Sequence, residues 1–172
     1  MNSIKNLLLV ASISLSLTLS AQWEKIETVD DFGDNTGESV LRVIVNGTFS
    51  NSATAGSDLI VKVADYGDAA LFTLYEYNKT PASMGYKGAF GSIKAKTSTG
   101  EIIKFSCFAP KGGGLLFSKE EHTTLFKYLY DGTGSEIKFV VASSDFSDYG
   151  SAKYSFSITT LTAEEKTKFG IE

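Results

Sequence analysis

The chain has few of the residues that form disulfide bonds, metal sites and many active sites. Its 172 residues include one cysteine, one histidine, one tryptophan, one arginine and two prolines. The lone cysteine, Cys107, excludes an internal disulfide, and a chain of this length can bury enough surface to fold without one. One histidine and one cysteine far apart in sequence make a poor zinc site. We therefore expect no metal and no cofactor.

Long apolar runs are also absent, except at the N-terminus. Lys5 precedes the apolar stretch Leu7–Leu19, and Ser20-Ala21 follows with small side chains. This stretch is too short to cross ~30 Å of hydrocarbon, and the pattern is typical of a secretory signal peptide. We expect cleavage after Ala21, which assigns residues 1–21 to the signal peptide and residues 22–172 to one domain. The protein is then exported to the periplasm or the extracellular space, with no membrane insertion after the signal peptide is removed.

Clustered positive charge is missing from the sequence as well. Without Lys5 the chain has 15 basic and 20 acidic side chains, a formal charge of −5, and Arg42 is the only arginine. Proteins that bind nucleic acid need clustered Lys and Arg to replace the counterions of phosphate. An anionic membrane surface attracts the same kind of cluster. The sequence therefore predicts neither nucleic acid nor an anionic membrane as a partner.

What the chain does contain is a succession of short strand patterns separated by turn residues. Alternation of apolar and polar residues predicts strands over Val40–Val45, Leu59–Val63, Leu71–Tyr77, Ile93–Lys96, Glu101–Phe105, Glu136–Val141 and Ala152–Ile158. Asn46-Gly47 and the Ser50–Ser57 tract predict a polar loop, and Asp65–Asp68 predicts a hairpin turn. One polar and one apolar face favour an antiparallel β-sandwich, or a small barrel, of eight or nine strands.

Two segments have helical rather than strand periodicity. Ser118 and Glu121 form a capping-box pattern before Leu125, Phe126 and Leu129, which predicts a helix over about 119–130 inserted between strands. The same pattern at Thr162-Ala-Glu-Glu165 predicts a short C-terminal helix that ends near Gly170. We expect the first helix to dock its apolar stripe on the strands, because a helix this short is marginal in isolation.

Neither His122 nor Cys107 is expected to be catalytic. His122 lies early in the predicted helix, at a position where an exposed polar side chain is the usual outcome, and no G-x-S-x-G motif accompanies it. Cys107 shares the apolar strand face of Ile103, Phe105 and Ala109, where a thiol behaves as a small hydrophobe. The acidic stretch Asp30–Glu38 could offer oxygen ligands to calcium, but it departs from known loop patterns and a solvated loop is the favoured interpretation.

Aromatic side chains are the one feature that indicates a binding surface. Tyr75, Tyr77, Tyr86 and Phe90 are the candidate binding residues, with Tyr75 and Tyr77 expected on one strand face. Such side chains could stack on a sugar or contact a partner, although aromatics also occur in strands because they fit a pleated surface.

The order of elements resembles a family of small exported β-sandwich proteins, the invasion-associated locus B proteins and an accessory protein of type VI secretion. The stretch that carries the resemblance is the helix Leu125–Gly132 followed by the strands Ile137–Val141 and Tyr154–Phe156. The resemblance implies an exported, non-enzymatic sandwich and brings no catalytic residues.

These observations predict a secreted or periplasmic non-catalytic binding protein, not an enzyme, whose partner is an unknown protein or envelope component. Two alternatives stay open. One is a barrel or sandwich that binds a small ligand or glycan through its Tyr- and Phe-rich strands. The other is a hydrolase that uses two carboxylates, for which the chain has acidic residues in number.

Overall fold

The fold is described here from a computed structural model, which describes residues 22–77, 79–82, 88–111, 113–148 and 150–172. The expected signal peptide and the candidate Tyr86 lie outside the described residues. The strands are β1 (Glu24–Val29), β2 (Asn35–Ser50), β3 (Ser57–Asp65), β4 (Ala70–Glu76), β5 (Thr80–Pro81), β6 (Ala89–Lys96), β7 (Ile102–Ala109), β8 (Leu115–Phe117), β9 (Glu136–Ala142) and β10 (Lys153–Thr159). The helices are α1 (Lys119–Leu129) and α2 (Ala163–Phe169), with a short 3₁₀ turn at Ser143–Asp145.

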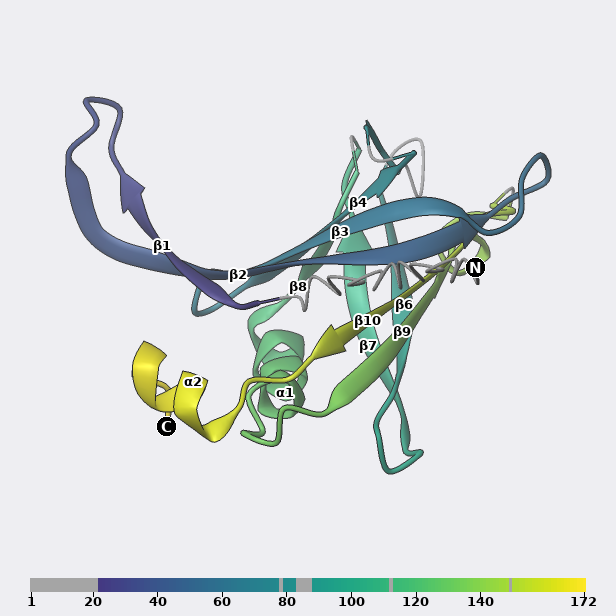
Figure 1. The fold of residues 1–172 in the computed structure, drawn as a ribbon. Helices are drawn as coiled ribbons and strands as arrows, with labels where there is room; N and C mark the ends of the chain where they lie inside the picture. The colour runs from purple at the N-terminus through teal and green to yellow at the C-terminus, as the bar shows by residue number, and fades with distance from the viewer. Residues whose placement is uncertain (1–21, 78, 83–87, 112, 149) are drawn as a thin grey trace, which may run out of the picture.

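Eight of these strands form a closed antiparallel barrel, so the expected mainly β class with two helices and the barrel alternative are confirmed, whereas the sandwich is wrong. The strands follow one another around the barrel in the order β2, β10, β9, β6, β7, β8, β4 and β3, and β3 pairs with β2 again (Figure 1). β1 and β5 are extra strands that pair with β2 and β4. Closure removes the free edges that the sheets of a sandwich keep.

The barrel closes because β2 is far longer than the alternating stretch Val40–Val45 predicts. Residues 41–49 of β2 pair with β3 on one side, and residues 47–50 pair with β10 on the other. The predicted loop at Asn46-Gly47 is therefore wrong: both residues lie inside the strand. Only the Ser50–Ser57 part of that tract turns the chain toward β3.

The N-terminal half of β2 leaves the barrel and forms a two-stranded arm with β1. Glu24–Glu27 pairs with residues 39–42, and the arm bends away from the barrel at the upper left of Figure 1. The acidic stretch Asp30–Glu38 covers the arm's turn and the start of β2, so the loop predicted for it is shorter than expected. In the turn the Asp30 carboxylate accepts hydrogen bonds from the backbone N–H groups of Phe32 and Asp34. Phe32 itself is 92% exposed at the tip.

Inward-facing side chains fill the barrel. Alternate residues of each barrel strand are buried, and at the centre the rings of Phe72, Phe139 and Phe156 contact one another with centroids 5.3 to 6.2 Å apart. Such packing is that of a protein core, in which side chains interdigitate and leave few voids.

Both helices form where the sequence predicts them, although the first caps differently. Leu125, Phe126 and Leu129 are buried, so the apolar stripe docks as expected. Ser118 stands at the N-cap of α1 but its side chain makes no capping hydrogen bond. The capping box does form at α2, where Thr162 and Glu165 bond to each other's backbone N–H groups, and Gly170 ends the helix with a φ of 72°.

Candidate functional site

Each end of the barrel has a carboxylate that accepts a hydrogen bond from a tyrosine hydroxyl. At the end near the β4–β5 turn, the hydroxyl of Tyr154 donates to Glu76 Oε1 at 2.6 Å. Phe49 stacks on Tyr154 and meets the edge of Tyr77 at 5.0 Å between ring centroids. Burial raises the pKa of the Tyr154 phenol, and the Glu76 carboxylate raises it further. These contacts join β2, β4 and β10 at this end.

At the other end, Asp65, the last residue of β3, links that strand to helix α1. Its Oδ1 accepts from His122 Nε2 at 2.7 Å and from the backbone N–H of Gly67 at 2.7 Å, and its Oδ2 accepts from the Tyr130 hydroxyl at 2.5 Å. Since a carboxylate only accepts, His122 Nε2 is the donor in this contact. Burial raises the pKa of the Tyr130 phenol, with a further contribution from the Asp65 charge.

The exposed position expected for His122 is wrong. The side chain is 7% exposed, and its ring stacks on Phe126 at 4.6 Å between centroids. A sequence signal for this was present: His122 stands three, four and seven residues before Leu125, Phe126 and Leu129, which places it on the docking stripe. An aspartate that orients a histidine also occurs in hydrolase triads. Here the carboxylate also bonds Tyr130 and Gly67, which indicates that it fixes α1 to the barrel.

Cys107 lies where the alternation of β7 predicts, with 4% of its surface exposed. Burial raises the pKa of its thiol to about 12, and the neighbouring Glu121 carboxylate adds to the shift. The thiolate, which is the nucleophilic form, is therefore disfavoured at neutral pH.

The three aromatic candidates that the structure describes, Tyr75, Tyr77 and Phe90, do not come together in one site. Tyr75 is half-buried on the outer face of β4 with the Lys62 ammonium 4.9 Å from its ring centre. Tyr77 follows the end of β4 with a φ of 50°, so strand alternation stops and the two tyrosines do not share a strand face. Phe90 lies on β6 and is 82% exposed.

Phe90 belongs instead to an apolar stripe that crosses the outside of the barrel. In register, Phe90 of β6 stands opposite Phe108 of β7, Phe108 opposite Leu116 of β8, and Leu116 opposite Leu71 of β4. The rings of Phe90 and Phe108 lie 5.0 Å apart, and Leu116 is 41% exposed. We call Phe90, Phe108, Leu116 and Leu71 the outer stripe. Sequence periodicity could not reveal it, because the residues come from four segments.

A groove runs beside the outer stripe, between β7, β8 and the start of α1. Its volume is about 290 Å³, and its lining includes Phe90, Phe108 and Leu116 of the outer stripe. Glu120 and Glu121 of α1 also line it. The groove therefore combines apolar and acidic side chains, a lining that suits an apolar segment carrying a basic residue.

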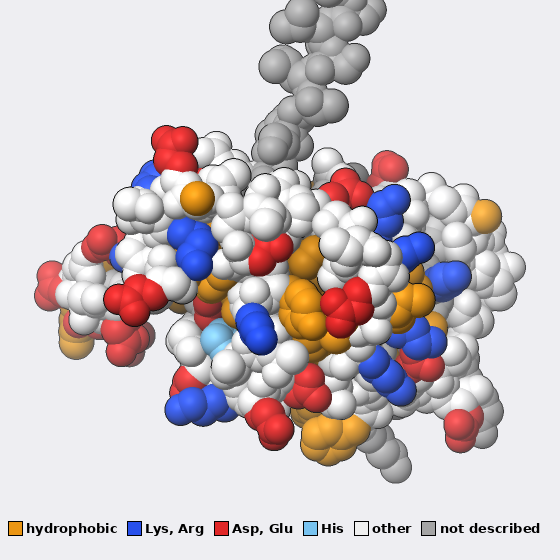
Figure 2. All heavy atoms as spheres, turned by 90° about the horizontal axis from the view of Figure 1, so that it is seen from below, with side chains coloured by type: hydrophobic (Ala, Val, Ile, Leu, Met, Phe, Trp, Pro, Cys, Tyr) orange, Lys and Arg blue, Asp and Glu red, His pale blue; other side chains and the backbone are white. Residues whose placement is uncertain are grey.

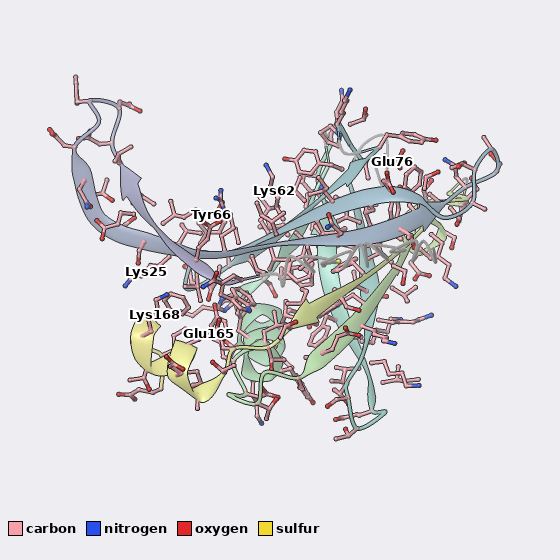
Figure 3. All side chains as sticks on the ribbon, viewed as in Figure 1. Lys25, Lys62, Tyr66, Glu76, Glu165 and Lys168 are labelled. Atoms are coloured by element: carbon pink, nitrogen blue, oxygen red, sulfur yellow. The ribbon has the colours of Figure 1, made fainter. Side chains whose placement is uncertain are left out.

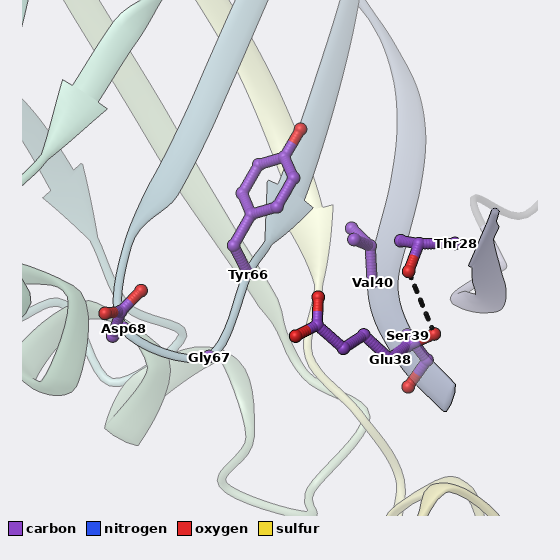
Figure 4. A pocket seen from close by; sticks show the side chains of 7 residues that line it. All are labelled: Thr28, Glu38, Ser39, Val40, Tyr66, Gly67 and Asp68. Atoms are coloured by element: carbon purple, nitrogen blue, oxygen red, sulfur yellow. Dashed lines mark hydrogen bonds between the residues drawn. The ribbon is translucent and has the colours of Figure 1, made fainter. Parts of the chain in front are cut away.

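A second hollow lies between the arm and the β3–β4 turn. Thr28, Glu38, Ser39 and Val40 line it from the arm, and Tyr66, Gly67 and Asp68 line it from the turn (Figure 4). Tyr66 and Lys62 point to the side toward which the arm bends (Figure 3). The residues that line this hollow are mostly polar or acidic, and Tyr66 is the one aromatic residue among them.

Within the part of the chain that the structure describes, no three His, Cys, Asp or Glu side chains gather as a metal site would require. In the acidic arm, the Asp30 carboxylate instead accepts the backbone N–H groups of Phe32 and Asp34. No helix among the described residues is long and apolar enough to span a membrane.

Comparison with known proteins returned no matching family model, no similar curated protein and no similar solved structure.

Proposed function

We propose that this protein is an exported, non-catalytic binding protein that holds a partner on the outer surface of its barrel. The observation that carries the proposal is the outer stripe, and above all Phe90. A phenylalanine that leaves 82% of its surface in water, in register with three further apolar side chains, is a recognised mark of an interaction surface.

The filled interior supports an outer site over an inner one. Barrels that carry small ligands hold them in the space between inward-facing side chains. In this barrel Phe72, Phe139 and Phe156 occupy that space. The alternative of a ligand or glycan bound inside the Tyr- and Phe-rich strands therefore has less support than a partner bound outside.

The groove beside the stripe defines the chemistry of the partner. Its apolar side chains would take an aliphatic or aromatic segment, and Glu120 and Glu121 would pair with a Lys or Arg on that segment. The partner is thus a protein segment in which an apolar run carries a basic residue.

Site-specific photo-crosslinking in the native host tests this function. A photoreactive phenylalanine analogue replaces Phe90 or Leu116, and Thr48, exposed on the outer face of β2, is the control position. We expect the two stripe positions to yield the same protein adduct, in which the crosslinked peptide is apolar with a basic residue. No adduct from the stripe positions, or the same adducts from position 48, would contradict the proposal.

A further inference from the structure

Two pairs of lysines face each other directly on the outside of the barrel. Lys94 of β6 stands opposite Lys104 of β7, and Lys96 of β6 stands opposite Lys138 of β9. All four are exposed, and they alternate with buried residues such as Ile93 and Phe139, so they point outward. We call these four residues the lysine patch. Like charges directly opposite in a sheet are destabilising, so this arrangement weakens the barrel that carries it.

Little in the described surroundings neutralises the patch. The ion pair that the structure records for it joins Lys138 to Glu136 at 4.0 Å, the limit for such a contact, between two exposed side chains. The neighbours in register are Val140 beside Lys94, Ile102 beside Lys96 and the hydroxyl of Ser157 beside Lys138. Figure 2 shows several basic side chains on the right of the face seen from below, with hydrophobic and acidic side chains among them.

We propose that the lysine patch binds a linear acidic polysaccharide, a chain of sugars that carry carboxylate or sulfate groups. Directly opposed residues are about 5 Å apart and alternate residues on one strand about 7 Å apart, so Lys104, Lys94, Lys96 and Lys138 follow one another in a stepped row across β7, β6 and β9. A polymer with a repeated negative charge can meet several of them at once. The Ser155 and Ser157 hydroxyls on the adjacent β10 can bond sugar hydroxyls.

Other anionic partners fit the patch less well. Nucleic acid recognition typically adds arginine and aromatic rings on which bases stack, and neither stands within the two lysine pairs. An anionic membrane would call for several exposed apolar side chains among the lysines, whereas Ile102 beside Lys96 is 72% exposed and Val140 beside Lys94 is half-buried. The expected export places the protein where acidic polysaccharides occur. The patch was hidden in the sequence because its lysines come from three segments.

Binding of the purified protein to a fluorescent oligouronate, measured by anisotropy, tests the proposal. We expect affinity that falls as salt rises, and weaker binding to a neutral oligoglucan of the same length. Each lysine is worth about fivefold in affinity near an anionic surface, so Lys94→Gln with Lys104→Gln should weaken binding roughly twenty-five-fold. The matched control is Lys119→Gln with Lys127→Gln, which removes the same charge from exposed positions on α1.

Three results would overturn the assignment. The first is no binding of the oligouronate, and the second is an equal loss of affinity in the patch and control variants. The third is tighter binding to phosphatidylglycerol vesicles or to a single-stranded oligonucleotide, which would assign the patch to another class of partner. Phe90→Ser should bind the oligouronate normally, so failure here and failure of the outer stripe can be distinguished.

Discussion

Asp65 is the residue whose removal tests the architecture most directly. Its carboxylate accepts hydrogen bonds from His122, Tyr130 and the backbone of Gly67, and so ties helix α1 to the end of β3. Asp65→Ala would leave the His122 and Tyr130 donors without their partner in a place that water reaches poorly. The N–H of Gly67 lies in an exposed turn, where water can replace the carboxylate.

The magnitude follows from two donors, the buried His122 ring and the half-buried Tyr130 hydroxyl. An unsatisfied buried polar group costs about 1–3 kcal/mol, so Asp65→Ala should lower the free energy of unfolding by about 2–6 kcal/mol. Asp65→Asn keeps the shape and one acceptor oxygen but cannot accept from both side chains, so its loss should be about 1–2 kcal/mol. Because small domains are stable by only about 5–15 kcal/mol, both losses should be visible in a urea melt.

Urea melts at neutral pH, followed by the fluorescence of Trp23, provide the assay. Trp23 is suitable because its ring contacts Tyr130 at 5.6 Å and Phe126 at 6.5 Å, so it reports the docking of α1. The control is Asp68→Ala in the same turn, an exposed change that should stay within about 0.5 kcal/mol. If Asp65→Ala unfolds at the same urea concentration as Asp68→Ala, the network does not hold the helix and our interpretation of His122 fails.

Three further predictions concern other parts of the barrel. Leu129→Ala should lower stability by about 2–5 kcal/mol because the side chain is fully buried, whereas the exposed Glu120→Ala should stay within about 0.5 kcal/mol in the same urea melts. The pKa of the Cys107 thiol rises from 9.0 in the unfolded chain to about 12 in the folded one, so the free energy of unfolding should decrease as the pH rises between these values, by up to about 1.4 kcal/mol per pH unit. In melts at alkaline pH, the stability of Cys107→Ala should therefore decrease less steeply with pH than that of the parent. Lys94→Gln should raise stability by about 0.2–1 kcal/mol by removing repulsion from Lys104, and thermal melts should show the gain shrinking in high salt.

The elements of the fold could be predicted from local patterns, because alternation and helical spacing record which side chains are buried. The alternating residues of β9 and β10 are buried as expected, and so is the stripe of α1. The exposed position expected for His122 follows from its polarity, whereas its place on that stripe decides its burial. A buried histidine needs a partner, and Asp65 lies too far away in sequence to suggest one.

The binding surfaces could not be predicted, because they depend on which strands become neighbours. The outer stripe draws one residue from each of four strands, and the lysine patch joins β6 to both β7 and β9. Local sequence fixes which face of a strand a side chain occupies, but not which side chain stands opposite it. The expectation that basic residues do not cluster holds along the sequence and fails on the surface.

Closure of the barrel depends in turn on one glycine that local patterns assign to a turn. Gly47 lies where β2 pairs with β3 and β10 together, and a Cβ there would stand 2.4 Å from the carbonyl oxygen of Ser155 and 2.8 Å from the Cβ of Phe156. No larger residue fits unless the backbone of β10 shifts, so the absent side chain permits the close approach that joins β2 to β10. Asn-Gly is a strong turn signal because glycine tolerates positive φ, but here it serves close packing instead. The Asn46-Gly47 pair thus predicts a loop when it is read locally, but in the fold it lies inside a strand and permits the barrel to close. That barrel brings β6, β7, β8 and β9 side by side, and with them the outer stripe and the lysine patch.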